Sequence, residues 1–434
     1  MSLTLVGIIG IGILLLLLAA QMPVGFSMAF CGIIGFGFVV SFSGALDILI
    51  KDFFSTYSSY GLTIIPLFVV MGYFAFEAGM SEKLYNSAYV IMGQRRGGLA
   101  MASIIACALF AAICGSTNAT AATMAKVAVP EMKRFKYDMK LATGSVAAGG
   151  TLGILIPPSV LLIIYGIMTQ QSIGKLFAAG IFPGILLAIL FTLTIAIWVR
   201  LDPKIAPMGV KRSWKEKFTA LGGMADTILI FALIIGGLLG GAFTSPEAGG
   251  VGAFLVLGMA LLRRKLTWKS LLQSLIGAAI TTCMIMIIVA GAMIFGHFLA
   301  VTRIPTSLTE WIGTLPLPRD AIISIIVLMY FLGGCFMDAL ALVMLTIPII
   351  YPLVMSLGYD PIWFGIIAVL VTEIGVITPP VGINVYVVKG VVQTESLGTI
   401  FKGVLPFVLA LFVCVAIMLI FPQIALFLPG LLSF

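Results

Sequence analysis

The stretches GGTLGILIPPS at residues 149–159 and VTEIGVITPPV at residues 371–381 decide the fold of this chain. Sliding the sequence against itself by 222 residues superposes the two stretches without a gap. The agreement extends well beyond one motif, since the same offset places Ser116 over Asp338. The chain therefore contains an internal repeat, and each copy of the repeat carries a helix-breaking pair of prolines.

The composition places the whole chain in a lipid bilayer. Of its 434 residues 61% are hydrophobic and only 9% are charged, and the mean hydropathy is +1.23. So few polar side chains cannot cover a water-soluble surface. Apolar runs recur from end to end, which predicts an all-α membrane protein with a single transmembrane domain over residues 1–434. Lys and Arg fall in short clusters between these runs, a pattern that predicts no nucleic acid binding.

Two apolar segments differ from ordinary membrane crossings. Residues 98–130 and 320–352 each break at the middle, at CGSTN and GGCFMD. Each could form two tight crossings or one re-entrant helical hairpin, and arms of about 15 residues fall short of the ~20 that a spanning helix needs. The hairpin is therefore favoured. Full crossings are predicted at residues 3–20, 24–44, 61–80, 140–170, 176–199, 224–244, 246–262, 272–300, 358–388 and 399–428.

The basic residues predict the orientation. If both segments are re-entrant, 20 of the 24 Lys and Arg fall in loops on one side of the membrane. The positive-inside rule makes that side cytoplasmic and places both termini outside, which is the periplasm for the expected location in a bacterial inner membrane. The first hairpin then enters from the cytoplasm and the second from outside.

Opposite entry of the hairpins predicts an inverted-topology repeat, in which substrate and ion sites lie where the repeats meet. The first repeat is predicted over residues 61–200, with the hairpin 98–130 and the broken helix 140–170. The second covers residues 272–428, with the hairpin 320–352 and the broken helix 358–388. Residues 1–60 and 201–271 are predicted to form scaffold helices and cytoplasmic loops.

Four breaks converge in this arrangement. They are the first tip (residues 115–118), the second tip (333–338), the first kink (153–158) and the second kink (375–380). Lipid cannot satisfy the backbone groups that a break frees, so such backbone survives where it lines an enclosed cavity or a ligand. Half-helix N-termini suit a carboxylate and freed carbonyls suit a small cation. The alternative is that these Gly and Pro residues only kink helices for packing.

Two carboxylates lie close to the breaks. Asp338 is the only one in the middle of a tip, where an ionisable side chain is costly unless it faces a cavity or a cation. It could instead be a protonated helix cap. Glu373, just before the second kink, could join the same site or anchor a neighbouring helix.

At these breaks the sequence resembles the large membrane subunit of the TRAP (tripartite ATP-independent periplasmic) transporters. The resemblance implies an elevator-type ion-transporter fold and sodium-driven uptake of an organic acid, commonly a C4-dicarboxylate or sialic acid. It also implies a small membrane subunit and a periplasmic substrate-binding protein as partners. The matching runs are AAICGSTNATAATM (111–124), VPEMKRFKYD (129–138), GTLGILIPPS (150–159), GAFTSPEAGGVGA (241–253) and ITPPVGINVYV (377–387).

The resemblance also implies a set of site residues. Two sodium sites are expected, one at each tip and its neighbouring kink, with the substrate between the tips. Apart from Lys126 at a hairpin end, no Lys or Arg falls at the predicted midplane, so carboxylate recognition would rest mainly on helix termini and hydroxyls. The implied sodium ligands are Ser116, Thr117, Asn118 and Gly153 for the first site, and Gly334, Asp338, Gly375 and Thr378 for the second; the implied substrate contacts are Ser116, Thr120, Pro157, Pro379 and Asn384.

Two other classes of function compete with this prediction. The hairpin-and-kink plan also suits a self-sufficient sodium and carboxylate symporter or antiporter that needs no binding protein. An intramembrane aspartyl protease would need two facing aspartates, and only Asp338 lies deep enough. The chain has no phosphate-binding P-loop, so we expect neither ATP hydrolysis nor enzymatic activity.

Overall fold

The computed structural model describes residues 2–209 and 212–432, and this part of the chain is helical and contains no strand. The prediction of an all-α fold is therefore confirmed. The helices of the first half are α1 (Leu3–Ala19), α2 (Val24–Val39), α3 (Phe42–Ser58), the 3-10 turn η1 (Tyr60–Thr63), α4 (Ile64–Glu77), α5 (Met80–Met92), α6 (Gly98–Cys114), α7 (Thr117–Arg134), α8 (Met139–Leu155), α9 (Val160–Thr169) and α10 (Ile173–Leu201). Those of the second half are α11 (Trp214–Leu239), α12 (Ser245–Leu262), α13 (Trp268–Val301), α14 (Ile304–Gly313), α15 (Arg319–Gly334), α16 (Ala339–Ser356), α17 (Pro361–Ile377), α18 (Ile383–Val391), α19 (Leu397–Ile420) and α20 (Gln423–Gly430).

The helix bounds follow the internal repeat. A shift of 222 residues carries α7 onto α16 and α8 onto α17 with identical ends. Equivalent residues begin these helices, because short polar side chains at the N-cap accept hydrogen bonds from free backbone N–H groups. Asp138 accepts one from Lys140 N at 2.7 Å, and its counterpart Asp360 accepts from Ile362 N at 2.8 Å. The same shift relates α2 to α12 within one residue at each end, so the correspondence reaches beyond the predicted repeats.

The N-terminal part differs from the predicted crossings. The crossing predicted at 24–44 ends at Val39, and a separate helix α3 begins at Phe42. The reason is local, because Ser41 has an extended backbone and its hydroxyl accepts a hydrogen bond from Gly44 N at 3.1 Å. Residues 81–97, which lie between the crossing predicted at 61–80 and the segment 98–130, likewise contain most of α5. Near the C-terminus, Pro422 divides the crossing predicted at 399–428 into α19 and α20.

The hairpin arms are longer than predicted. The arms α6 and α7 have 17 and 18 residues, and α15 and α16 have 16 and 18, where about 15 were expected. Eight helices in the described chain are long and apolar enough to cross a membrane, and α16 is one of them. The short-arm argument for re-entry was therefore wrong for α16. Re-entry of the two hairpins stays a prediction that rests on their polar tips.

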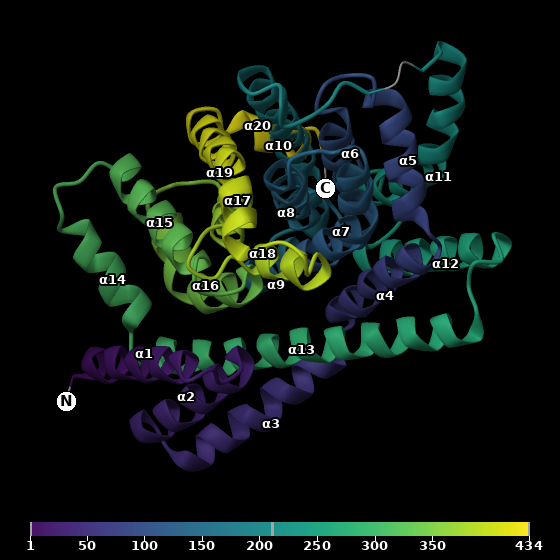
Figure 1. Ribbon diagram of the computed structural model, residues 1–434. Coiled ribbons are helices and arrows are strands. Elements are labelled where there is room, and N and C mark those ends of the chain that lie inside the picture. The colour runs from purple at the N-terminus through teal and green to yellow at the C-terminus, as the bar shows by residue number, and fades with distance from the viewer. Residues whose placement is uncertain (1, 210–211, 433–434) are drawn as a thin grey trace.

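The helices form two layers that meet at the tips. In Figure 1 the long helix α13 runs along one side of the molecule, where it packs against α2, α3 and α4. The hairpins and broken helices lie on the other side, where α8 packs against α6, α7 and α19, and α17 packs against α15 and α16. We call the first layer the scaffold and the second the core. Buried aromatic and aliphatic side chains fill the core.

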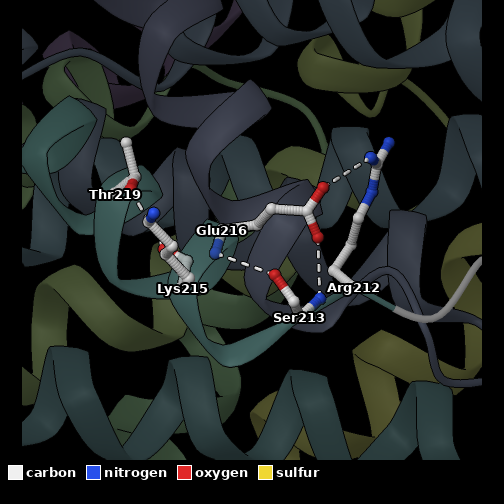
Figure 2. A network of polar contacts seen from close by, with 5 residues as sticks. All are labelled: Arg212, Ser213, Lys215, Glu216 and Thr219. Carbon is white, nitrogen blue, oxygen red and sulfur yellow. Dashed lines mark hydrogen bonds and ion pairs between the residues drawn. The ribbon is translucent and has the colours of Figure 1, made fainter.

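Polar contacts fix the helices that join the layers. Figure 2 shows the start of α11, where Ser213 and Glu216 form a capping box: Glu216 N donates to Ser213 Oγ at 3.2 Å, and Ser213 N donates to Glu216 Oε2 at 2.7 Å. Further along α11, Asp226 accepts from Lys83 of α5 at 2.8 Å and pairs with Arg263 at the end of α12. One carboxylate therefore ties three helices together.

Candidate functional site

A cavity of about 870 Å³ separates the scaffold from the core. Its scaffold wall comes from the start of α2 and from apolar side chains of α4 and α13, such as Val24, Val69 and Met284. Its core wall contains the first tip together with residues 338–341 of the second hairpin. Volumes of this size hold small organic ligands, and a mostly apolar wall with a few convergent polar groups is typical of such sites.

The first tip is built by close backbone packing. Gly115 ends α6 in the left-handed region, with φ of +65°, which a side chain would strain. Ser116 then caps α7, and its hydroxyl accepts a hydrogen bond from Ala119 N at 3.4 Å. The first kink lies directly behind, where a Cβ at Gly153 would lie 2.5 Å from the carbonyl oxygen of Ser116. Glycine at 153 is what allows the tip to touch the kink.

The second tip repeats this packing with different side chains. A Cβ at Gly375 of the second kink would lie 2.1 Å from the carbonyl carbon of Gly334. Asp338 caps α16 and accepts a hydrogen bond from Leu340 N at 3.1 Å. The carbonyl oxygen of Cys335 accepts one from Val381 N at 3.2 Å, which ties the tip to the loop after the kink. Each tip is therefore held by its own kink.

The N-termini of α7 and α16 both open into the cavity. The helix dipole and free N–H groups make these ends favourable for an anion. Asp338 places a carboxyl group at the second end, whereas Ser116 places a hydroxyl at the first. The two ends therefore differ in the polar group that caps them.

Several buried oxygens beside the tips lack hydrogen-bond partners within the described residues. Thr120 Oγ1 and Asn384 Oδ1 are among them, and both side chains are fully buried. The amide of Asn384 donates to the carbonyl oxygen of Ala147 at 3.2 Å, which links α18 of the second repeat to α8 of the first. Both carboxylate oxygens of the buried Glu373 are also without a partner. Unpaired buried oxygens are costly unless a ligand or an ion satisfies them.

The structure divides the residues expected at the site into three groups. Ser116, Thr117, Asn118 and Asp338 line the cavity. Gly153, Gly334 and Gly375 form the packed backbone between tips and kinks, and Thr378 ends α17 within the second kink. Thr120, Pro157, Pro379 and Asn384 lie on the core side, outside the residues that line the cavity within the described chain.

Sequence reasoning missed most of the scaffold wall. A hydrogen bond of 3.1 Å joins the hydroxyls of Tyr73 and Thr281 across α4 and α13, and both residues line the cavity. Polar side chains inside long apolar helices were the available signal for this pair. No sequence signal marked Gly25 in the α2 wall. This glycine matters through its contact with Ile287, which is far away in sequence.

Comparison with known proteins matches both the sequence and the fold. Residues 11–424 match the family model "Tripartite ATP-independent periplasmic transporter, DctM component". The C4-dicarboxylate TRAP transporter large permease protein DctM of Pseudomonas aeruginosa is 36% identical over 399 residues, which cover 89% of this chain and 93% of that protein. The sialic acid TRAP transporter large permease protein SiaM of Vibrio cholerae is 32% identical, with 96% of each chain covered. The crystal structure of the Alcanivorax borkumensis YdaH transporter superposes with a TM-score of 0.64 at 14% identity, over 87% of this chain and 88% of that one, and shows the fold alone.

Proposed function

Because the chain belongs to the DctM component family of the tripartite ATP-independent periplasmic transporters, we propose that it imports an organic acid by sodium symport. It is a multi-pass membrane protein and the large permease subunit of its transporter. The proposed substrate class is a C4-dicarboxylate or a sugar acid such as sialic acid, the substrates named for two relatives. One observation carries the proposal, namely the cavity onto which both helix tips open.

The two tips would have different tasks. An acid would place its carboxylate at the N-terminus of α7, where Ser116 and free N–H groups favour negative charge. Sodium would bind the backbone oxygens packed between each tip and its kink, together with Asp338 at the second tip. Coupling would follow because the acid and one sodium ion both use the first tip, so that an ion bound behind this tip stabilises it in the form that holds the acid.

The cavity supports an inward-facing arrangement. Beyond the tips its walls come from Phe76, Lys126 and Thr281, which lie on helix halves next to the basic loops, and from Pro23 in a short loop that the predicted topology places on the same side. The charge distribution predicts that these loops are cytoplasmic and that both termini are periplasmic. For import by an elevator mechanism, the core would slide along the scaffold wall and carry the tips from one side of the membrane to the other.

The partners follow from the family. A small membrane subunit would associate with this chain, and a periplasmic binding protein would deliver the acid. Transport by this complex would require no ATP, since the sodium gradient would supply the driving force.

Uptake into proteoliposomes tests the proposal. The liposomes hold this chain with or without the small subunit, and labelled succinate or sialic acid is added with or without the binding protein, under an inward sodium gradient. We expect uptake only when all three proteins and the gradient are present. Uptake of free acid by this chain alone would replace the tripartite proposal with a self-sufficient carrier, and uptake without sodium would remove the coupling.

A further inference from the structure

Lys126 is the only basic residue among those that line the cavity within the described chain, and Asp338 is the only acidic one. Lys126 lies on α7, ten residues after the cap Ser116, or about 15 Å along the helix axis. Side chains on a helix lean toward its N-terminus, so the lysine stem reaches back toward the first tip. The cavity-facing side of α7 continues from the tip to this lysine through Ala119, Ala122 and Thr123.

The lysine has no carboxylate partner. None of the ion pairs within residues 2–209 and 212–432 includes Lys126. Its ammonium lies 5.5 Å from the ring centre of Phe76, a cation–π contact between α7 and α4. Glu77 follows Phe76 in sequence, and it forms no ion pair with Lys126. An ammonium among apolar walls without a counter-ion attracts an anion from solution.

We propose that Lys126 binds the anionic group of the substrate in the inner half of the cavity and makes that half selective for organic acids. The proposal rests on the proposed function, because it needs an acid as substrate. The lysine adds what the tips lack, since the N-terminus of α7 offers partial charge only, whereas Lys126 carries a full positive charge on the path between the first tip and the inner mouth. The substrate would exchange the tip for Lys126 as it leaves.

Exchange transport measures this inner site directly. Liposomes with this chain and its small subunit are loaded with unlabelled succinate or sialic acid, and entry of labelled acid from the binding protein is followed. The luminal concentration that half-saturates exchange reports affinity at the inner side. We expect Lys126→Gln to raise it about five- to tenfold, Lys126→Glu to raise it further, and Lys126→Arg to leave it near the parent value.

Two controls separate binding from folding. Lys133→Gln removes a charge from the same helix at an exposed position outside the cavity and should leave the half-saturating concentration unchanged. Lys126→Cys provides a rescue: a methanethiosulfonate that adds an ammonium should restore affinity, and one that adds a sulfonate should weaken it. The parent chain treated with the same reagents corrects for its own cysteines.

The outcomes separate this proposal from the function on which it rests. If the parent complex transports either acid and the Lys126 variants behave like Lys133→Gln, Lys126 does not bind the substrate and the proposed function stands. Equal effects of the two thiol reagents on Lys126→Cys would also overturn it, because they would show a role for volume and not for charge. If the parent complex transports no acid, both proposals fail together.

Discussion

Alanine at position 375 should disable the second ion site before it unfolds the protein. The added Cβ would lie 2.1 Å from the carbonyl carbon of Gly334, and ordinary contact begins near 3.4 Å, so the second tip must move by about 1.3 Å. Ion ligands tolerate displacements of only ~0.2 Å. We therefore expect Gly375→Ala to lose sodium-dependent uptake.

The stability change should be smaller than the loss of transport. Overpacking of this kind costs about 1–3 kcal/mol, and replacing glycine by alanine inside a helix returns up to ~1 kcal/mol. The net destabilisation is then roughly 0–3 kcal/mol, small enough for a folded variant. Uptake under a sodium gradient and thermal unfolding of the purified chain measure the two effects separately.

Two further glycines make the test quantitative. Gly153→Ala places its Cβ 2.5 Å from Ser116 O, so the first tip should move less than the second and lose less activity. Gly258→Ala in α12 meets nothing within 4 Å and should transport normally. Equal sodium dependence of uptake in Gly375→Ala and Gly258→Ala would refute the packing argument.

The remaining predictions concern charge. Asp338→Asn should raise the sodium concentration needed for half-maximal uptake about tenfold, because the ion loses a charged ligand, and unaltered sodium dependence would remove Asp338 from the site. Asp226→Asn should destabilise the chain by only about 1 kcal/mol, since its ion pairs with Lys83 and Arg263 are partly exposed. Faster hydrogen exchange in α5 would show the loss, and exchange like that of the parent would argue against a stabilising role of these ion pairs. Burial and then the hydrogen bond to Asp320 raise the pKa of Tyr359 from 10.0 to about 12. Stability from this neutral phenol is complete below pH 10 and disappears as pH rises through about 12. The phenolate absorbance that Tyr359→Phe removes should therefore titrate near 12, and a midpoint near 10 would contradict the contact with Asp320.

Much of the fold was predictable because its constraints are local. Pro and Gly restrict or free the backbone wherever they occur, so the four breaks were visible without a structure. A helix cap was one of the two alternatives for Asp338, because short polar side chains favour helix starts. Helix α3 was missed because its start depends on a single serine inside a run that otherwise reads as continuous with α2.

The candidate site was predictable only on its core side. The tips contain polar residues that stand out in an apolar chain, so Ser116, Thr117 and Asn118 could be named in advance. The opposite wall is apolar like the rest of the scaffold, and nothing in residues such as Val24 or Met284 distinguishes a cavity wall from a lipid-facing side chain.

The sequence by itself determined the membrane location, the helical content, the duplication and the positions of the breaks. Hydropathy, helical periodicity and the restrictions of proline all depend on residues that are close together in the sequence. Tertiary structure decided which breaks touch and what faces them. Gly153 meets Ser116, Gly375 meets Gly334, and Lys126 lies over Phe76, each through the packing of helices that are distant in sequence. Such contacts depend on the summed fit of many side chains, which no short stretch of sequence encodes.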